Sequence, residues 1–386
     1  MRCKWKNYQI GDLCNSVSET YKGKDEYVVL INTSDVLDGR ILNHTLTKNA
    51  DLKGQFKKKF QTKDILYSEI RPANKRFAFV NIENTQNYIA STKLMIIRAN
   101  TDIVLPEYLF IFLQMPAVIA ELQMLAETRS GTFPQITFSS EVAPLNICLP
   151  DKETQNEIVE IFCSFRDKIE LNNKINENLE RQARAIYEEM FTNNPNIEIN
   201  QGVLSDIAVI TMGQSPSGSS YNEDGNGEVF YQGRAEFGFR FPTRRLFTTE
   251  PKRMAEANDV LLSVRAPVGD LNVAYEQCCV GRGLGAIHSK DGNSSFLLYT
   301  MFALKPQLDI FNGEGTVFGS INKDGLSNLP VDIPCADEIA KFEKSVRPMD
   351  DLIRTNYEEN CRLQMLRDSL LPRLMSGEIA VEDVNI

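Results

Sequence analysis

The chain contains an internal repeat, and this repeat constrains the fold more than any single motif does. The run Asp64-Ile-Leu-Tyr-Ser68 resembles Asp259-Val-Leu-Leu-Ser263. Further along, Leu145 to Pro150 corresponds to Leu329 to Pro334 at an offset of 184 residues. Because a repeated sequence indicates a repeated structural unit, we expect two similar halves.

After the proline that ends each repeated segment, a series of residues begins that alternates spacings of four and three. In the first half the series is Ile158, Phe162, Phe165, Ile169, Asn172, Asn176, Leu179, Ala183, Ile186, Met190. Adding 184 gives Phe342, Val346, Met349, Ile353, Asn356, Asn360, Leu363, Arg367, Leu370, Leu374. In this second series only Arg367 is neither apolar nor one of the repeated asparagines. This spacing is typical of coiled coils, so each series predicts a long helix whose narrow apolar stripe the other helix can cover.

The two predicted helices also define a pairing register. If they pack antiparallel, the numbers of facing residues have a constant sum of 532, which places Asn172 opposite Asn360 and Asn176 opposite Asn356. Slippage would turn these amides against apolar side chains, so we expect the four asparagines to fix the register. The alternative is a looser bundle in which they face solvent. Pro348 falls inside the second helix, where we expect a kink or a restart.

The repeat and the helices divide the chain into five parts: 1–150, a helical spacer at 151–192, 200–334, a second spacer at 335–378, and a tail at 379–386. The regions 1–150 and 200–334 mix short β-rich runs, such as Tyr27 to Ile31, with a few helical patterns, such as Glu107 to Leu113. We therefore predict an α+β fold, in which two similar α/β domains are separated by two long helices. These helices form an antiparallel coiled coil, and the whole chain has a pseudo-two-fold internal repeat.

The net charge of −10 argues at first against DNA binding, because contacts with phosphates usually leave a basic surface. The charge is unevenly distributed: residues 1–150 carry +3, whereas 151–200, 201–334 and 335–386 carry −5, −4 and −4. Basic residues gather in three runs, Lys53 to Lys63, Arg71 to Arg76 and Arg234 to Arg253. Any one run is also typical of a solvated surface, so charge alone leaves the question open.

The sequence lacks the motifs of common catalytic sites. There is no Asn-Pro-Pro-Tyr or Asp-Pro-Pro-Tyr run to hold a flipped adenine, and no Gly-x-x-x-x-Gly-Lys-Ser/Thr loop for nucleotide phosphates. The eight cysteines never form Cys-x-x-Cys, and there are only two histidines. No run approaches the roughly 20 apolar residues that span a bilayer. We expect a soluble cytoplasmic protein that is not an enzyme and holds no metal and no cofactor.

Local motifs then resemble those of one family, the specificity subunits of Type I restriction-modification systems. Leu370 to Ile379 looks like the characteristic end of that family's second conserved helix. Gly213-Gln-Ser-Pro216, Tyr221-Asn222 and Tyr231-Gln-Gly-Arg234 resemble the opening of a target recognition domain. The order of globular region and long helix, repeated once, resembles the family over the whole chain.

Further motifs agree in part with this resemblance. Arg129 to Thr132 and Glu314 to Thr316 stand where target recognition domains commonly have a glycine turn. In the first half, Tyr8 to Leu13 fits the start of such a domain, but no Gly-x-Ser-Pro run follows. The DNA contacts of the first domain are therefore harder to place.

The resemblance implies that 1–150 and 200–334 are target recognition domains 1 and 2. Each would bind one half of an asymmetric, bipartite site in double-stranded DNA, and the helices would set the number of unread base pairs. It also implies two modification subunits, which carry S-adenosylmethionine and the methyl-transfer chemistry. Through them, restriction subunits with motor and nuclease activities would act against foreign DNA.

Sequence recognition needs side chains that match base edges, chiefly Arg for guanine and Asn or Gln for adenine, with Lys and Arg on phosphates. In the second domain the candidates are Gln232 and Arg234 as first choices, then Tyr221, Asn222, Arg240, Arg265 and Arg282. In the first domain they are Lys57, Lys58, Arg71, Lys75 and Arg76, which suit phosphates better than bases. For each of them the competing interpretation is a surface charge or a hydrogen bond that stabilises the fold.

Two other functions remain open at this point. The first is a specificity subunit of a Type IIB-like enzyme, whose partner fuses methylation and cleavage. The second is a coiled-coil scaffold that joins proteins and never touches DNA, which the acidic net charge favours. Salt-dependent DNA binding by the assembled complex would separate the scaffold from the DNA-reading functions.

Overall fold

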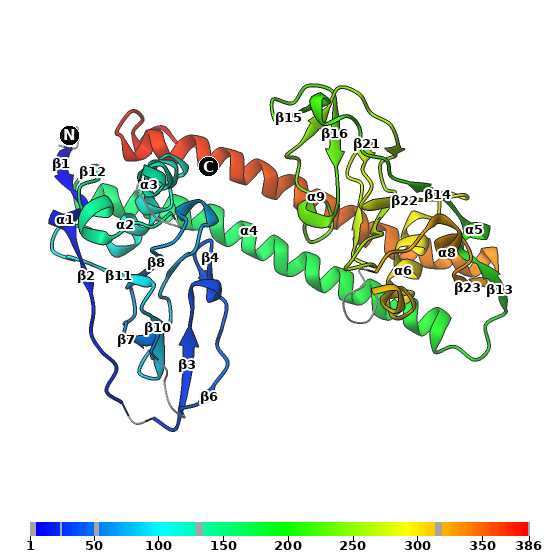
Figure 1. Cartoon of the computed structure of the whole chain (residues 1–386), viewed down its shortest axis with the longest axis horizontal. Coiled ribbons are helices and arrows are strands. Elements are labelled where there is room, and N and C mark those ends of the chain that lie inside the picture. Colours follow the sequence, from blue (N-terminus) through cyan, green and yellow to red (C-terminus); the bar gives the residue numbers. More distant parts are fainter. Residues whose placement is uncertain (1–4, 24, 50–53, 129–133, 313–318, 385–386) are drawn as a thin grey trace. The chain divides into compact units, whose positions relative to one another are not determined.

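The computed structural model describes residues 5–23, 25–49, 54–128, 134–312 and 319–384. The chain divides into two compact units (Figure 1). Unit 1 comprises Met1–Glu170 and Asn360–Ile386, and unit 2 comprises Leu171–Glu359. Each unit therefore contains one globular region together with part of each long helix.

Unit 1 is built on two four-stranded sheets. The first has the order β2 (Cys14–Val17), β11 (Leu94–Ala99), β8 (Ile65–Ser68) and β9 (Phe77–Phe79), with all neighbours antiparallel. The second has the order β6 (Thr47–Lys48), β3 (Tyr27–Ile31), β10 (Tyr88–Ser91) and β7 (Phe56–Lys58), in which β3 and β10 run parallel. A short hairpin, β4 (Val36–Leu37) with β5 (Arg40–Ile41), joins them.

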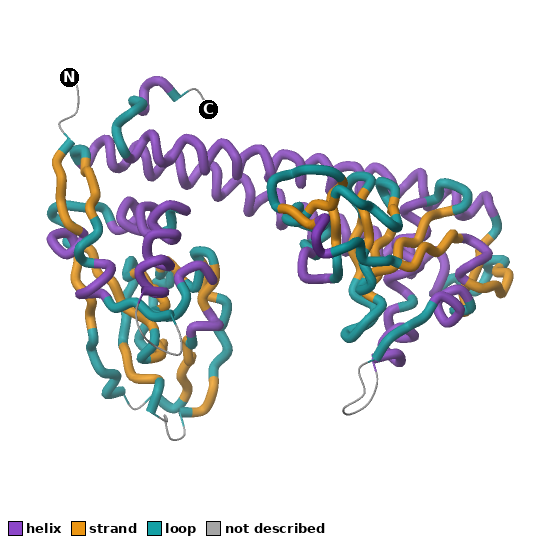
Figure 2. Tube along the Cα trace, turned by 45° about the horizontal axis from the view of Figure 1, so that its top comes forward, coloured by secondary structure: helices purple, strands orange, loops and turns teal. Residues whose placement is uncertain are grey.

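Alternation along the strands places the first sheet between two apolar cores. Leu66 and Ile96 point into the core that this sheet shares with Val29 and Ile31 of the second sheet. Their neighbours Ile65 and Tyr67 of β8, and Met95 and Ile97 of β11, point to the opposite face, because successive side chains of a strand alternate. That face is covered by α2 (Pro106–Leu113) and α3 (Pro116–Thr128), which lie between the sheets and helix α4 (Lys152–Tyr187) (Figures 1 and 2).

Unit 2 repeats this arrangement. One sheet has the order β14 (Ala208–Met212), β22 (Leu284–Ser289), β19 (Val260–Ser263) and β20 (Leu271–Val273). The other has the order β15 (Tyr221–Asn222), β17 (Phe247–Thr248), β16 (Glu228–Tyr231), β21 (Cys278–Val280) and β18 (Met254–Ala255). The parallel pair of β16 and β21 corresponds to the parallel pair of β3 and β10. Helices α6 (Ser294–Ala303), α7 (Lys305–Asp309) and α8 (Lys323–Ser327) complete the domain.

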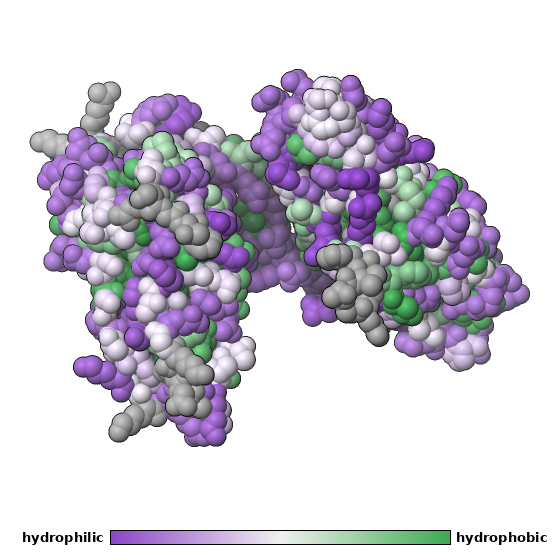
Figure 3. All heavy atoms as spheres, viewed as in Figure 1, coloured by the Kyte–Doolittle hydropathy of each residue, from purple (hydrophilic) through white to green (hydrophobic). Residues whose placement is uncertain are grey.

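Both domains are also closed in the same way. In unit 1 the antiparallel pair of β1 (Lys6–Gln9) and β12 (Asn146–Leu149) leads into helix α1 (Ile10–Leu13). In unit 2 the pair of β13 (Ile199–Val203) and β23 (Pro330–Pro334) leads into helix α5 (Leu204–Ile207). The predicted α+β fold with an internal repeat is confirmed. Figure 3 shows mostly hydrophilic side chains on one face of each unit, as expected when the large apolar residues fill the cores.

The long helices contribute to the core of each unit. At 36 residues, α4 is about 54 Å long at 1.5 Å per residue, and α9 (Ala336–Met375) has 40 residues. In unit 1, Ile158 and Phe162 of α4 share an apolar core with Leu374 of α9. In unit 2, the Tyr187 ring of α4 packs edge-on against Phe342 of α9 with centroids 5.6 Å apart. Each helix therefore covers the stripe of the other within both units, as the coiled-coil prediction requires.

The restart expected as one outcome at Pro348 is wrong, because α9 is a single helix from Ala336 to Met375. Proline removes one backbone hydrogen bond and costs a helix interior about 3 kcal/mol. Here Val346 and Ile353, on either side of Pro348, are both fully buried in the core of unit 2. Their packing against that core offsets the cost of the proline, so the helix continues.

Among the residues that the structure describes, no single helix is long and apolar enough to cross a membrane. Among these residues, α2 and α3 have the necessary length and apolar composition when they are taken together, across a bend of 62°.

Candidate DNA interface

In unit 2, four loops meet at one end of the two sheets. We call this the loop junction, and it consists of residues 213–216, 232–234, 264–266 and 281–283. Backbone hydrogen bonds fasten the loops together: Gly283 N–H donates to the Gln232 carbonyl at 3.1 Å, and Val264 N–H donates to the Gly283 carbonyl at 2.9 Å. The backbone N–H of Arg282 donates to Ser215 Oγ at 3.2 Å. Side chains from distant parts of the sequence are thereby brought together.

Glycines make this close approach possible. A Cβ on Gly283 would lie 2.7 Å from the Gln232 carbonyl oxygen, and one on Gly213 would lie 2.2 Å from the Gly281 oxygen. Neither distance is compatible with any side chain larger than hydrogen. Glycines stand on both sides of Arg282 because Gly281 and Gly283 each contact the backbone of another loop.

Three of the candidate side chains project from the loop junction. Gln232, Arg265 and Arg282 are all exposed. Their amide and guanidinium groups are the ones that match adenine and guanine in the major groove. Because the backbone beneath them is fixed by hydrogen bonds, they form the best candidate for base contacts in the second domain.

Tyr221 and Asn222 lie on β15 and are only partly exposed. The Tyr221 hydroxyl donates to the Pro216 carbonyl at 3.1 Å, and its ring packs on Phe230 at 4.9 Å. The Asn222 side chain donates to the Asn226 carbonyl and accepts from Asn226 N–H, both at 2.9 Å. Both side chains therefore hold the surrounding loops in shape, which the sequence did not reveal.

Arg234, a first choice from the sequence, is half-exposed and forms an ion pair with Asp270. Asp270 directly precedes β20, and its N–H donates to Ser263 Oγ at 3.0 Å. The structure thus directs the Arg234 guanidinium toward Asp270, whereas Gln232, two residues earlier, faces solvent.

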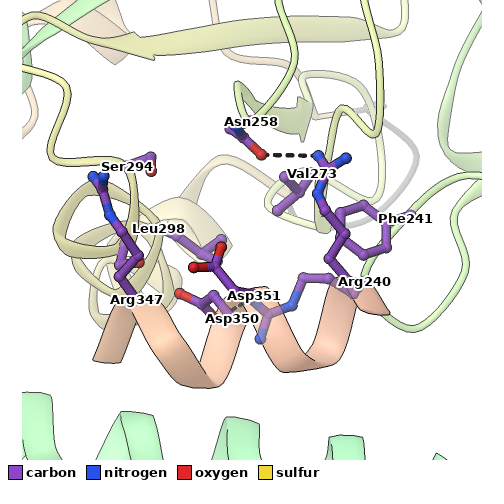
Figure 4. Close-up of a pocket in the computed structure, with 11 residues that line it drawn as sticks. Arg240, Phe241, Asn258, Val273, Ser294, Leu298, Arg347, Asp350 and Asp351 are labelled. Atoms are coloured by element: carbon purple, nitrogen blue, oxygen red, sulfur yellow. Dashed lines mark hydrogen bonds and ion pairs between the residues drawn. The ribbon is translucent and has the colours of Figure 1, made fainter. Parts of the chain in front are cut away.

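The prediction that Arg240 contacts DNA is wrong, because this residue is 5% exposed and lies inside unit 2. Its guanidinium bonds to Asp350 of α9 at 2.7 Å and to Glu180 of α4 at 3.0 Å. Figure 4 shows Arg240 and Asp350 turned toward one another beside a small cavity. Burial alone would lower the pKa of the guanidinium, but Tyr299, Asp350 and Glu180 raise it above the ordinary value. Arg240 therefore ties the second domain to both helices and cannot reach DNA.

In the first domain, two of the candidates also form contacts within the fold. Lys58 turns its ammonium group to the Leu94 carbonyl at 2.9 Å, and burial lowers its pKa. Arg76 donates to the Ser34 carbonyl at 3.0 Å. These contacts give Lys58 and Arg76 a role in the fold, which competes with the predicted role at DNA phosphates and which the sequence did not reveal.

The other candidates of the first domain are exposed. Lys57 lies on β7, whereas Arg71 and Lys75 flank a short turn at Pro72–Asn74 between β8 and β9. Both flanking residues have left-handed backbones, with φ of 47° and 52°. The glycine turns expected at Arg129 to Thr132 and Glu314 to Thr316 lie outside the described residues.

The helix-pairing asparagines lie on the coiled-coil seam and are buried, between 1% and 7% exposed. Within unit 2, Asn356 Nδ2 donates to Asn176 Oδ1 at 2.7 Å. Asn172 Nδ2 donates to Glu359 Oε2 at 2.7 Å. Asn360 belongs to unit 1 and is 7% exposed. The sequence series did not include Glu359, because it lies beside the seam.

The chain has two similar α+β domains, each built onto a pair of long helices. Each domain presents exposed basic or amide side chains. These features define a class of paired-domain recognition protein. Comparisons with known proteins identify the family within that class. The family described as "Type I restriction modification DNA specificity domain" matches residues 3–181 and again 196–364. The chain therefore belongs to the family of Type I restriction-modification specificity subunits.

Individual relatives agree with this assignment. The chain is 30% identical to the Type I restriction enzyme HindI specificity subunit of Haemophilus influenzae, over 97% of this chain and 99% of the relative. It is also 30% identical to the putative type I restriction enzyme MjaX specificity subunit of Methanocaldococcus jannaschii, over 83% and 79%. The crystal structure of a Type I restriction-modification S subunit from M. genitalium is similar in fold, with a TM-score of 0.55 at 15% identity over 97% and 96%.

Proposed function

We propose that this chain is the non-catalytic, DNA-reading subunit of a Type I restriction-modification complex. Each domain binds one half of an asymmetric, bipartite site, and the two long helices set the number of base pairs between the halves. The observation that carries this proposal is the loop junction. It presents Gln232, Arg265 and Arg282 together on a backbone that hydrogen bonds and glycine contacts hold in place.

The exposed residues differ in the role we assign to them. Gln232 and Arg282 suit base edges, since an amide pairs with adenine and a guanidinium with guanine. In the first domain, Lys57, Arg71 and Lys75 suit phosphates, which fix the position of the protein but carry no sequence information. Domain 1, at residues 1–150, and domain 2, at residues 200–334, thus recognise DNA with different sets of side chains.

The chemistry belongs to partner subunits. We assign S-adenosylmethionine and methyl transfer to two modification subunits, and cleavage of foreign DNA to restriction subunits that bind through them. An exposed apolar stripe on the helices of unit 2 supports such a partner. Leu171 and Ile175, one turn apart on α4, are 52% and 37% exposed, and Leu352 of α9 is 43% exposed.

The position of this stripe can be deduced from the seam. Glu180 and Asp350 each follow a seam residue and face the second domain, where Arg240 binds them. Ile175 and Leu352 each precede a seam residue, which places them on the opposite flank of the helix pair. An apolar stripe that the domain does not cover is suited to helices of another subunit.

Methylome sequencing of the host, with and without this chain, tests the function directly. The expected result is a bipartite motif that loses its methylation when the chain is removed. Persistence of every motif would contradict the proposal. A Type IIB-like system differs in its neighbouring reading frames, because only a Type I system adds a separate motor subunit. An assembled complex without salt-dependent DNA binding would favour the scaffold.

A further inference from the structure

Unit 2 contains a cavity of about 480 Å³ beside the loop junction, with which it shares Arg234. We call it the basic cavity. Its walls include Arg184, Arg234 and Lys305, together with Asp270 and the ring of Phe302. Three cations around one carboxylate give the walls an excess of positive charge.

The three cations come from three separate elements. Arg184 belongs to the long helix α4, Arg234 to the turn after β16, and Lys305 to the start of α7. Their side chains are 41%, 49% and 39% exposed. Each is therefore partly covered by the protein while its charged end remains accessible to a ligand from solvent.

Contacts within the fold hold these side chains in place. The Arg184 guanidinium stacks on the Phe302 ring, 3.5 Å from its centroid, and bonds to Glu180 at 2.7 Å. The Lys305 ammonium pairs with Asp309 at 2.9 Å. Glu180 and Asp309 balance the charges of Arg184 and Lys305 from outside, since neither carboxylate lines the cavity. The charged groups are thus oriented before a ligand arrives, which reduces the entropy lost on binding.

The Asp270 carboxylate lies where a bound anion would contact the cations of the cavity. Its Oδ2 pairs with Arg234, and its Oδ1 lies 3.8 Å from the Lys305 ammonium. A phosphate group offers the same kind of oxygen acceptors as a carboxylate, and arginine binds both groups in a bidentate manner. A phosphate that enters the cavity would compete with Asp270 for Arg234 and Lys305.

We propose that the basic cavity binds a backbone phosphate of the DNA at the second half-site. Helix α4 then takes part directly in DNA binding through Arg184, in addition to its role as a spacer. This inference rests on the proposed function. It gives Arg234 a role in positioning the duplex, and leaves base recognition to the neighbouring Gln232 and Arg282.

The test compares Arg184→Gln with Arg181→Gln in the assembled complex with its modification subunits. Both substitutions remove one positive charge from α4, but Arg181 does not line the cavity and bonds to Asn178 instead. Binding is measured on a duplex with the methylated motif and on an unrelated duplex, each between 50 and 200 mM salt. Thermal unfolding of each variant complex reports on the fold.

We expect Arg184→Gln to weaken binding to both duplexes by a similar factor, because a phosphate contact carries no sequence information. The slope of log affinity against log salt falls by about one, so the advantage of the unmodified protein shrinks about threefold over this salt range. Lys305→Gln gives the same result without disturbing the Phe302 stacking. Arg181→Gln leaves the slope nearly unchanged.

Asp270→Asn provides a result of opposite sign. The amide can still accept a hydrogen bond from Arg234, but the competing negative charge is gone, so we expect tighter binding to both duplexes. A purely structural role for Asp270 would weaken binding or leave it unaltered, and either result would overturn its role as a competitor of phosphate.

Two further outcomes would overturn the inference. In the first, Arg184→Gln and Lys305→Gln behave like Arg181→Gln while the complex still prefers its motif. In the second, inorganic phosphate stabilises the DNA-free complex through Arg184, yet the salt slope on DNA does not change, which assigns the cavity to a free anion. If the unmodified complex shows no preference for any DNA sequence, the proposed function itself fails.

Discussion

The side-chain amide of Asn356 donates a 2.7 Å hydrogen bond to the side-chain oxygen of Asn176, and both residues are at most 7% exposed. This contact joins the two long helices within unit 2. The residues one heptad away from this amide pair on the seam are apolar, so the hydrogen bond is lost when the register shifts by a heptad. Movement of either helix by one heptad would leave both amides facing apolar groups, at a cost of about 1–3 kcal/mol for each unsatisfied group.

This contact leads to a prediction about stability. Asn176→Leu alone leaves the Asn356 amide without its acceptor, and we expect the free energy of unfolding to fall by about 1–3 kcal/mol. Asn356→Leu alone should behave similarly. The double variant removes both amides and should be less destabilised than either single variant, because two leucines can pack together. Denaturant unfolding of the four proteins measures the coupling, and strictly additive losses would argue against a direct contact.

The buried ion pairs of Arg240 give a second prediction. Arg240→Met leaves Glu180 and Asp350 without this cation, and we expect a loss of about 3–5 kcal/mol in the free energy of unfolding. Arg244→Met is the matched control, because Arg244 is 51% exposed and pairs with Glu276 at the surface. That substitution should cost less than about 1 kcal/mol. Equal losses in the two variants would contradict the structural role of Arg240.

The sequence predicted the fold well because its signals are local or repeated. The alternating series that begins at Ile158 and Phe342 predicts the two helices, and the offset of 184 predicts a second domain like the first. The possible restart at Pro348 was wrong, since local helix preference says nothing about the core into which Val346 and Ile353 pack. The free energy gained by tertiary packing outweighs the cost of the proline in the helix.

The candidate site was harder to predict, because exposure depends on partners far away in the sequence. Arg240 stands in a basic run, but Glu180 and Asp350, which bury it, are 60 and 110 residues distant. No local pattern contains that information. The Gly281-Arg-Gly283 run did contain a usable signal, because two glycines around an arginine indicate close backbone contacts. It identifies the part of the second domain where loops converge.

Base recognition by the loop junction gives a third prediction. Gln232→Ala in the assembled complex should relax one base of the second half-site by about 1–3 kcal/mol, as for a lost bidentate contact. The first half-site should stay the same. Gln86→Ala is the control, since Gln86 is an exposed glutamine of the first domain outside its basic runs. Methylome sequencing checks both variants, and a motif that Gln232→Ala leaves unaltered would exclude this residue as a base contact.

The role of the helices as a spacer gives the last prediction. Seven residues inserted after Glu170 and seven after Glu359 add one heptad to each helix at the boundary of the two units. The contacts inside each unit, including those of Arg240 and the loop junction, are left intact, and the a/d pattern of both stripes is preserved. Seven residues lengthen a helix by about 10 Å, which corresponds to about three base pairs of duplex at 3.4 Å each.

The expected outcome is a methylated motif with the same two half-sites and a gap about three base pairs longer. Insertion into α4 alone is the control, because it shifts the seam of one helix past that of the other. It should reduce methylation instead of lengthening the gap of the methylated motif. If the paired insertion keeps full activity on the original gap, the helices do not set the spacing. Loss of methylation at every gap length in a stably folded complex would contradict the same model, because both domains would be intact and only their separation altered.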